Sequence, residues 1–118
     1  MKRDIDLARK ILLTVEARPA GARPAVLVLD EYPPDEVADH IELLVEANLL
    51  EALDASSFSG RSWIVQRLTW EGHDFVEAAR VESIWTRAKA YILDKGSVLT
   101  FEVLKQVLAA LARERLSS

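Results

Sequence analysis

The stretch from Pro34 to Phe75 constrains the fold of this chain more than any other part. Apolar residues recur at helical spacing from Pro34 to Ala47, and Asn48 favours the left-handed turn that ends many helices. Two short segments with strand composition follow, Leu50–Asp54 and Arg61–Leu68, and small residues separate them. A helix, a hairpin and the start of another helix are therefore predicted in this order.

The remaining segments are predicted to be mostly helical. A face of apolar residues, a cap or a breaker marks each element. The expected elements are a helix capped by Asp4 or a neighbour that runs to about Ala17, a strand at Ala25–Leu29 that could join the hairpin, a helix capped by Thr69 and beginning at Trp70, a helix at Val81–Asp94 that Lys95 and Gly96 end, and a helix capped by Thr100 at Phe101–Arg115. Together with the hairpin, this order is typical of a winged helix-turn-helix. The sequence thus predicts an α+β fold that is mostly helical, with a β-wing of two or three strands and two C-terminal helices.

Length and composition indicate one domain. The chain has 118 residues, and we expect a winged-helix-like core at 1–80 followed by a helical extension at 81–118. It has no cysteine, and acids rather than a long apolar run follow its first three residues. No apolar stretch approaches the roughly 18–20 residues of a membrane span. We therefore expect a cytoplasmic protein that contacts no membrane.

No residue set predicts a chemical reaction or a bound cofactor. His40 and His73 are the two histidines of the chain, each beside an acid, but their spacing matches no metal-binding motif. We expect both at the surface or at the boundary of the core. The glycine–lysine loop of a phosphate-binding site is also missing from the sequence. The predictions are therefore no enzyme, no cofactor and no metal.

Charge is unevenly distributed along the chain. The net charge is −4, yet the segment from residue 24 to residue 60 has nine acids and neither Lys nor Arg. Five of these acids fall on the central predicted helix: Asp35, Glu36, Asp39, Glu42 and Glu46. In a winged helix, a helix in this position enters the major groove, where phosphates would repel carboxylates. We therefore predict that this acidic face contacts a partner protein or solvent, and not DNA.

DNA binding stays open as the alternative. Basic residues near the N-terminus and on the hairpin would then form a basic edge along the first helix and the wing. These residues are Lys2, Arg3, Arg9, Lys10, Arg61 and Arg67. Topology favours this alternative, and the charge of the central helix opposes it.

Packing of the aromatic residues can also be predicted. Leu68, Trp70 and Phe75 are expected to pack together where the hairpin meets the next helix, because Thr69 turns the chain there. Phe58, at the hairpin tip, is expected to fold back onto the protein.

Four stretches of the sequence resemble an uncharacterised family. They are MKRDIDLARKILL at the start, EANLLEA after the central helix, RLTWEGHDF at 67–75 and IWTRAK at 84–89. Over nearly its whole length the chain is similar to the bacterial and phage-associated family called domain of unknown function 2513. The resemblance implies a small winged-helix-like α+β domain in a phage or mobile-element context, with no activity and no catalytic residues to assign. This chain has only one full helix between Pro24 and the hairpin, where ordinary winged-helix regulators usually place two.

The leading prediction is an uncharacterised non-enzymatic protein, a regulator or adaptor that acts by protein–protein interaction. The alternative is a DNA-binding transcriptional regulator that uses its wing and first helix. Small winged-helix proteins similar to this one often dimerise through terminal helices, and the last helix here has a wide apolar stripe. We predict a homodimer held partly by Leu104, Leu108 and Leu111. The identity of the partner protein or operator stays open.

Overall fold

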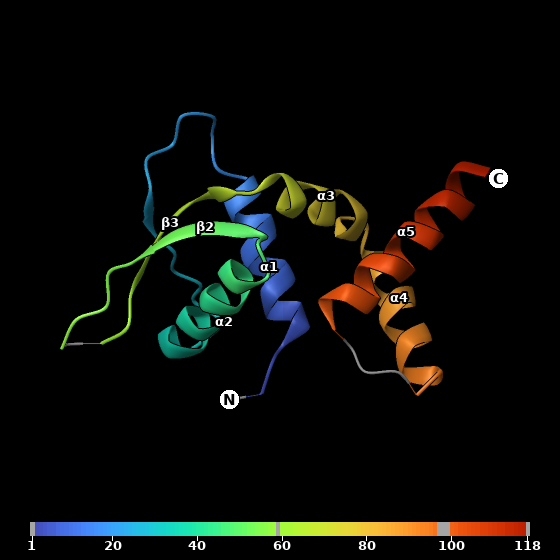
Figure 1. Ribbon diagram of the computed structural model, residues 1–118, viewed down its shortest axis with the longest axis horizontal. Coiled ribbons are helices and arrows are strands. Elements are labelled where there is room, and N and C mark those ends of the chain that lie inside the picture. Colours follow the sequence, from blue (N-terminus) through green and yellow to red (C-terminus); the bar gives the residue numbers. More distant parts are fainter. Residues whose placement is uncertain (1, 59, 97–99, 118) are drawn as a thin grey trace. The chain divides into compact units, whose positions relative to one another are not determined.

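The computed structural model describes residues 2–58, 60–96 and 100–117 (Figure 1). These residues form α1 (Ile5–Glu16), β1 (Ala25–Val26), α2 (Pro34–Glu46), β2 (Leu50–Asp54), β3 (Trp63–Leu68), α3 (Trp70–Ala79), α4 (Glu82–Asp94) and α5 (Phe101–Ser117). The predicted α+β class is confirmed, with five helices and three strands in the described residues. The chain divides into two compact units, Met1–His73 and Asp74–Ser118, so the division falls inside α3.

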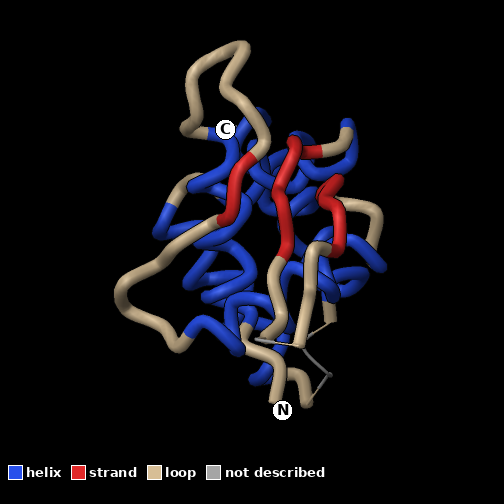
Figure 2. Tube along the Cα trace, turned by 90° about the vertical axis from the view of Figure 1, so that its left-hand side faces the viewer, coloured by secondary structure: helices blue, strands red, loops and turns tan. Residues whose placement is uncertain are grey.

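The three strands of the first unit form one antiparallel sheet, with β3 in the centre and β1 and β2 at its edges (Figure 2). The predicted third strand is present, but strand pairing includes only Ala25 and Val26. The register of β2 against β3 shifts at Glu51, because Ala52 pairs with Val65 while Glu51 pairs with Arg67. This bulge leaves one residue of β3 unpaired, which allows Val65 and Leu68, three positions apart, to be buried together.

Helices α1 and α2 cover the sheet. Helix α1 packs against α2 and β3, and α2 packs against β2. The core of this unit consists of side chains that are at most 5% exposed: Leu7, Ile11, Leu12, Val15, Val37, Ile41, Leu44, Leu50, Val65 and Leu68. The apolar faces predicted for both helices are therefore confirmed, and each buried aliphatic side chain of this size stabilises the fold by about 1.5–3 kcal/mol.

Short polar contacts fix the start of α1. The carboxylate of Asp4 accepts hydrogen bonds from the backbone N–H groups of Asp6 and Leu7, at 3.0 and 3.1 Å. These donors have no partner inside the helix, so the cap satisfies both. The predicted cap is thus confirmed.

Asn48, Leu49, Thr69 and Gly72 form the junction between α2, the sheet and α3. Asn48 adopts a φ of 61°, the left-handed turn predicted for it. The Thr69 hydroxyl donates to the Asn48 carbonyl at 2.6 Å and accepts from the Gly72 N–H at 2.9 Å. A Cβ at Gly72 would collide with the Leu49 carbonyl oxygen. Glycine is therefore required there by close packing of two backbone segments.

The second unit is built around aromatic rings. Phe75 meets Trp85 edge-on with ring centroids 6.2 Å apart, and meets Phe101 in the same way at 5.5 Å. Helices α4 and α5 pack against each other, and α5 begins at the predicted cap, where the Thr100 hydroxyl accepts from the Val103 N–H. Such edge-to-face pairs add about 0.5–1.5 kcal/mol each beyond the area that they bury.

Two aromatic predictions were wrong. Trp70 is 82% exposed and does not pack with Phe75, because residues five positions apart on a helix point about 140° apart. Phe58 does not fold back, since its exposure is complete. Ser57 and Gly60 exchange backbone hydrogen bonds of 2.9 and 3.1 Å, and this closed turn leaves Phe58 at the very tip of the hairpin.

No helix in residues 2–58, 60–96 and 100–117 is long and apolar enough to cross a membrane.

Candidate functional site

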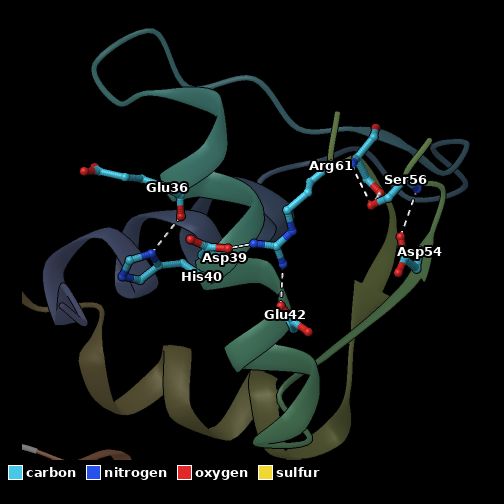
Figure 3. A network of polar contacts seen from close by, with 8 residues as sticks. Glu36, Asp39, His40, Glu42, Asp54, Ser56 and Arg61 are labelled. Atoms are coloured by element: carbon cyan, nitrogen blue, oxygen red, sulfur yellow. Dashed lines mark hydrogen bonds and ion pairs between the residues drawn. The ribbon is translucent and has the colours of Figure 1, made fainter. Parts of the chain in front are cut away.

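Arg61 links the hairpin to the acidic helix α2 (Figure 3). Its guanidinium forms ion pairs with Asp39 and Glu42, which share a face of α2 because they are three residues apart. The Arg61 side chain is 41% exposed, so each pair contributes only about 0–1 kcal/mol. The larger effect is on charge, because one cation neutralises much of the field of two carboxylates.

The five predicted contact acids therefore fall into two groups. Asp39 and Glu42 are paired with Arg61, a cation from the hairpin, since α2 has no Lys or Arg of its own. Asp35, Glu36 and Glu46 are exposed, and within the described residues no side chain forms an ion pair with them. These three carboxylates remain available to a partner of opposite charge.

Three residues of the predicted basic edge are paired with acids of the same unit. Lys10 forms an ion pair with Glu31 and lies over the ring of Tyr32. Arg67 lies opposite Glu51 in the sheet and donates to its carboxylate from Nε at 2.9 Å and from Nη2 at 3.1 Å. Arg61 is bound to α2 in the same way, so Lys10, Arg61 and Arg67 would each have to leave a carboxylate before they could neutralise a phosphate.

The other three basic residues lie along the start of the chain. Lys2 and Arg3 precede α1 and are exposed, while Arg9 is half-buried on α1. Lys2 and Arg3 form no ion pair with another described residue. They are the cations of the predicted edge that nucleic acid could reach without breaking an internal pair.

His40 is buried, so the prediction that it lies at the surface or boundary was wrong. Its Nε2 accepts a hydrogen bond of 2.8 Å from the Asp4 N–H, and its Nδ1 lies 2.7 Å from the Glu36 carbonyl oxygen. A backbone N–H can only donate, so Nε2 is unprotonated and Nδ1 carries the proton that is donated to Glu36. His40 thus joins the start of α1 to α2 as a neutral ring, whereas His73 is exposed as expected.

A partly enclosed cavity of about 120 Å³ lies between β1 and the first turns of α2. Its walls come from residues 26–29, from Val37, Ala38 and Ile41 of α2, and from Trp63 of β3. Beside it, Val26 is 54% exposed and Val28 is 75% exposed. The edge of the sheet at β1 is therefore apolar and open, next to the acidic start of α2.

The indole Nε1 of Trp63 is buried and has no hydrogen-bond partner among the described residues. Trp63 lines the cavity, whereas its Nε1 is buried beneath the surface. A buried N–H without an acceptor costs about 1–3 kcal/mol, so such groups are uncommon in folded proteins.

The hairpin carries a second polar cluster near its tip (Figure 3). The Ser56 hydroxyl and the Ser56 backbone N–H, the latter at 2.9 Å, lower the pKa of the Asp54 carboxyl below its usual value of 3.8. Ser56 Oγ also accepts from the Ser62 N–H at 3.0 Å. These contacts join the two strands just below the tip.

The residues predicted for a dimer are mostly inaccessible. Leu104 and Leu108 are completely buried within the chain, and only Leu111 is partly exposed. Their position on the inward face of α5 follows from the same apolar stripe that suggested a dimer. A cavity of about 380 Å³ beside Leu111 is lined by Tyr91 and Val107 as well. The dimer stays a prediction, and a second copy can reach Leu111 but not Leu104 or Leu108.

The structural roles of three residues were not predicted from the sequence. For two of them the sequence contained an indication. His40 lies three residues after Val37 and four before Leu44, which places it on the buried face of α2. Gly72 lies in the first turn of a helix, where glycine is costly unless packing requires it. Trp63 had no such signal, because both faces of the hairpin carry apolar residues.

Within the described ranges, no three His, Cys, Asp or Glu side chains are grouped so that they could hold a metal ion. The predictions of no enzyme, no cofactor and no metal stay predictions.

Comparisons with known proteins identify a family. A family model described as "Hypothetical protein (DUF2513)" matches residues 2–98. An "Uncharacterized protein" from Haemophilus influenzae is 34% identical over 119 residues, a match that covers 99% of this chain and 100% of the relative. No solved structure matches the chain. The resemblance read from the residues is confirmed, and the chain belongs to the family of the domain of unknown function 2513.

Proposed function

We propose that this protein is a non-enzymatic binding module, a regulator or adaptor whose partner is a protein with a basic contact surface. The observation that supports this proposal is the distribution of charge on α2. Arg61 pairs with Asp39 and Glu42, while Asp35, Glu36 and Glu46 stay exposed without such a partner among the described residues. A basic protein surface complements these carboxylates and would gain association rate and specificity from them.

Nucleic acid fits this face less well. Carboxylates on a helix docked in a groove would lie within a Debye length of many phosphates, about 8 Å at physiological salt. Lys10, Arg61 and Arg67 would each have to exchange an internal carboxylate for a phosphate. Such an exchange gains little, because one ion pair is lost for each one formed.

The test compares two variants that change net charge equally. In the first, Asp35→Asn, Glu36→Gln and Glu46→Gln remove the exposed acids of α2. In the matched control, Glu71→Gln, Asp74→Asn and Asp94→Asn remove three exposed acids elsewhere. Affinity capture from the host, with mass spectrometry of protein and nucleic acid together, should give the same protein partner for wild type and control, and lose it with the first variant.

Selective DNA binding would contradict the proposal. If the wild-type protein binds one duplex sequence tightly and the first variant loses that selectivity, then α2 reads bases, and the acids accept hydrogen bonds from cytosine. If capture is unchanged by the first variant, the acidic face is not the contact surface.

The second candidate is a DNA-binding regulator with a winged-helix-like N-terminal unit. The observation that favours it is topological, because α2 leads directly into the hairpin β2–β3 and α3 follows. The exposed Lys2 and Arg3 would add contacts to phosphates. Two phosphate contacts predict a slope of about −1.8 in log K against log salt, and the double change Lys2→Ala and Arg3→Ala should flatten it.

Self-association is part of the same proposal. Sedimentation at micromolar and higher concentrations should show a homodimer that Leu111→Lys weakens, while Lys105→Ala, a change at a half-buried residue of the same helix, serves as the control. A monomer at all concentrations would reject the dimer.

A further inference from the structure

We infer that the β1 edge of the sheet binds an extended segment of the partner protein, with one apolar side chain in the adjacent cavity and Lys or Arg side chains beside the acids at the start of α2. This inference rests on the proposed function, since it names the site and the chemistry by which a basic partner would be recognised. The observations that support it are an open strand edge, a cavity of suitable size, an unsatisfied donor and complementary charge.

The first observation is the strand edge. In the described residues β1 pairs only with β3, and no strand lies along its other side, although the Ala25 carbonyl also accepts a hydrogen bond of 3.3 Å from Arg18 Nη2. Val26 and Val28, two residues apart, are exposed by 54% and 75% and extend the edge as an apolar row. Proteins usually shield an open edge with charge or proline, because an added strand can hydrogen-bond to it. Extended peptides bind to such edges, with main-chain hydrogen bonds for affinity and side-chain pockets for specificity.

The second observation is the cavity behind that edge. Its volume is about 120 Å³, and its walls are mostly aliphatic and aromatic, with residues 26–29 on one side and Val37 and Ile41 on the other. An apolar cavity of about 150 Å³ admits a molecule the size of benzene. This cavity can therefore take one aliphatic side chain from a strand that lies along β1.

The third observation is the Trp63 indole. Trp63 lines the cavity, and its Nε1–H is buried beneath the surface with no acceptor among the described residues. A peptide carbonyl that entered with the apolar side chain would supply that acceptor once the wall relaxes. A peptide therefore offers a hydrogen-bond acceptor for this N–H group, whereas an aliphatic molecule offers none.

Charge selects the kind of peptide. Asp30, Asp35 and Glu36 are exposed on the loop and helix that border the cavity. Lys10 already pairs with Glu31, and Arg61 already pairs with Asp39 and Glu42 of α2. An acidic segment would be repelled here, and a segment that alternates apolar and basic residues matches both the edge and its border.

The test uses defined peptides with the full-length protein. The probe is a peptide of about ten residues that alternates Val and Lys, and the controls replace every Val by Ser or every Lys by Glu. In a titration of the isotopically labelled protein, the Val–Lys peptide should shift the amide signals of residues 25–29 and the indole N–H signal of Trp63, in a saturable manner. The Ser–Lys and Val–Glu peptides should shift them far less.

Matched variants at the two edges of the sheet locate the site. Val28→Ser should weaken binding of the Val–Lys peptide about tenfold, because most of an exposed Val side chain would become buried in the complex. Leu53→Ser is the control, since Leu53 is also exposed, at 55%, but lies on β2 at the opposite edge. It should change the affinity less than about twofold. Both side chains are exposed, so neither change should affect folding, and thermal unfolding of each variant checks this.

Each other outcome overturns the inference. Peptide shifts confined to β2 or to the second unit would place the site elsewhere. Equal losses with Val28→Ser and Leu53→Ser would show unspecific apolar adsorption, and equal binding of the Ser–Lys peptide would show charge attraction alone. Shifts at residues 25–29 that grow with protein concentration, without peptide, would show that a second copy occupies the edge. Shifts at the same residues with duplex DNA would show that nucleic acid occupies it.

The same variants separate this inference from the proposed function. If the captured partner is lost with the α2 acid variant and retained with Val28→Ser, the protein-binding function stands and the edge site is wrong. If the α2 acid variant and Val28→Ser both lose the partner while Leu53→Ser retains it, the protein-binding function and the edge site are both supported. If capture yields no acid-dependent protein partner and the chain instead binds duplex DNA selectively, the proposed function itself fails.

Discussion

The backbone N–H of Asp4 donates a hydrogen bond of 2.8 Å to Nε2 of His40, 36 residues further along the chain. Asp4 also caps α1 through its carboxylate, and His40 donates from Nδ1 to the Glu36 carbonyl one turn earlier on α2. One buried imidazole therefore connects the N-cap of α1 with the first half of α2.

Replacement of His40 should destabilise the N-terminal unit. His40→Leu replaces the imidazole by an apolar side chain of similar length and leaves the Asp4 N–H without its acceptor. The free energy of unfolding should therefore fall by about 1–3 kcal/mol. His73→Leu, at the exposed histidine, should change it by less than about 0.5 kcal/mol. Chemical unfolding measures both, and equal effects of the two changes would show that the Asp4–His40 bond does not stabilise the fold.

Gly72 should not tolerate even one added methyl group. Gly72→Ala places a Cβ against the Leu49 carbonyl oxygen, and α3 must then move away from the sheet. We expect a loss of about 1–3 kcal/mol, although alanine favours helices more than glycine does by about 1 kcal/mol. Glu71→Ala, at the exposed neighbouring position, should be close to neutral. A stabilised Gly72→Ala protein would show that the two backbone segments are not in close contact.

Replacement by alanine should lower the free energy of unfolding much more at Phe75 than at Trp70, although both residues lie on α3. Phe75 is 2% exposed and packs against two aromatic rings, so Phe75→Ala should cost about 3–5 kcal/mol. Trp70→Ala removes a side chain that is 82% exposed and should cost less than about 0.5 kcal/mol. Chemical unfolding followed by circular dichroism measures both, and a loss below about 1 kcal/mol for Phe75→Ala would show that the ring is not part of the core.

The pKa of Asp54 should be low and should depend on Ser56. In the folded protein the Ser56 hydroxyl and N–H stabilise the carboxylate, so the folded-state pKa lies below the unfolded-state value. The resulting stability is present above the unfolded-state pKa and is lost as pH falls through the folded-state pKa. Ser56→Ala removes the hydroxyl and should raise the pKa of Asp54 toward 3.8 in a side-chain NMR titration. Ser57→Ala, a change at the exposed neighbouring residue, should leave the pKa of Asp54 unchanged.

Local rules predicted most of the elements. Asp4, Thr69 and Thr100 cap helices where the sequence places them, because a cap depends on residues only a few positions away. Asn48 and Gly96 adopt positive φ at the ends of helices for the same local reason. The helices of the second unit begin and end within about two residues of the expected positions, which is the usual uncertainty of helix ends.

The candidate site was less predictable, because it depends on contacts between distant residues. Arg61 follows a long segment without Lys or Arg, yet the hairpin returns it to Asp39 and Glu42 of that same segment. The sequence therefore indicated the acids of this face but not the ion pairs that Arg61 forms with two of them. The cavity beside β1 requires the register of Ala25 against Val65, and neither composition nor periodicity determines that register.

The Thr69 hydroxyl, placed between the Asn48 carbonyl and the Gly72 N–H, makes the end of one helix and the beginning of another depend on a single atom. A hydrogen bond of this one hydroxyl would therefore be lost if the chain frayed after α2 or at the start of α3. The amides of Gly72 and His73 should therefore exchange with solvent at rates close to those of the last turn of α2, although more than twenty residues lie between them. Serine at position 69 would keep the hydroxyl and with it the similar exchange rates. Valine would remove the hydroxyl, and the exchange rates at the two helix ends should then differ.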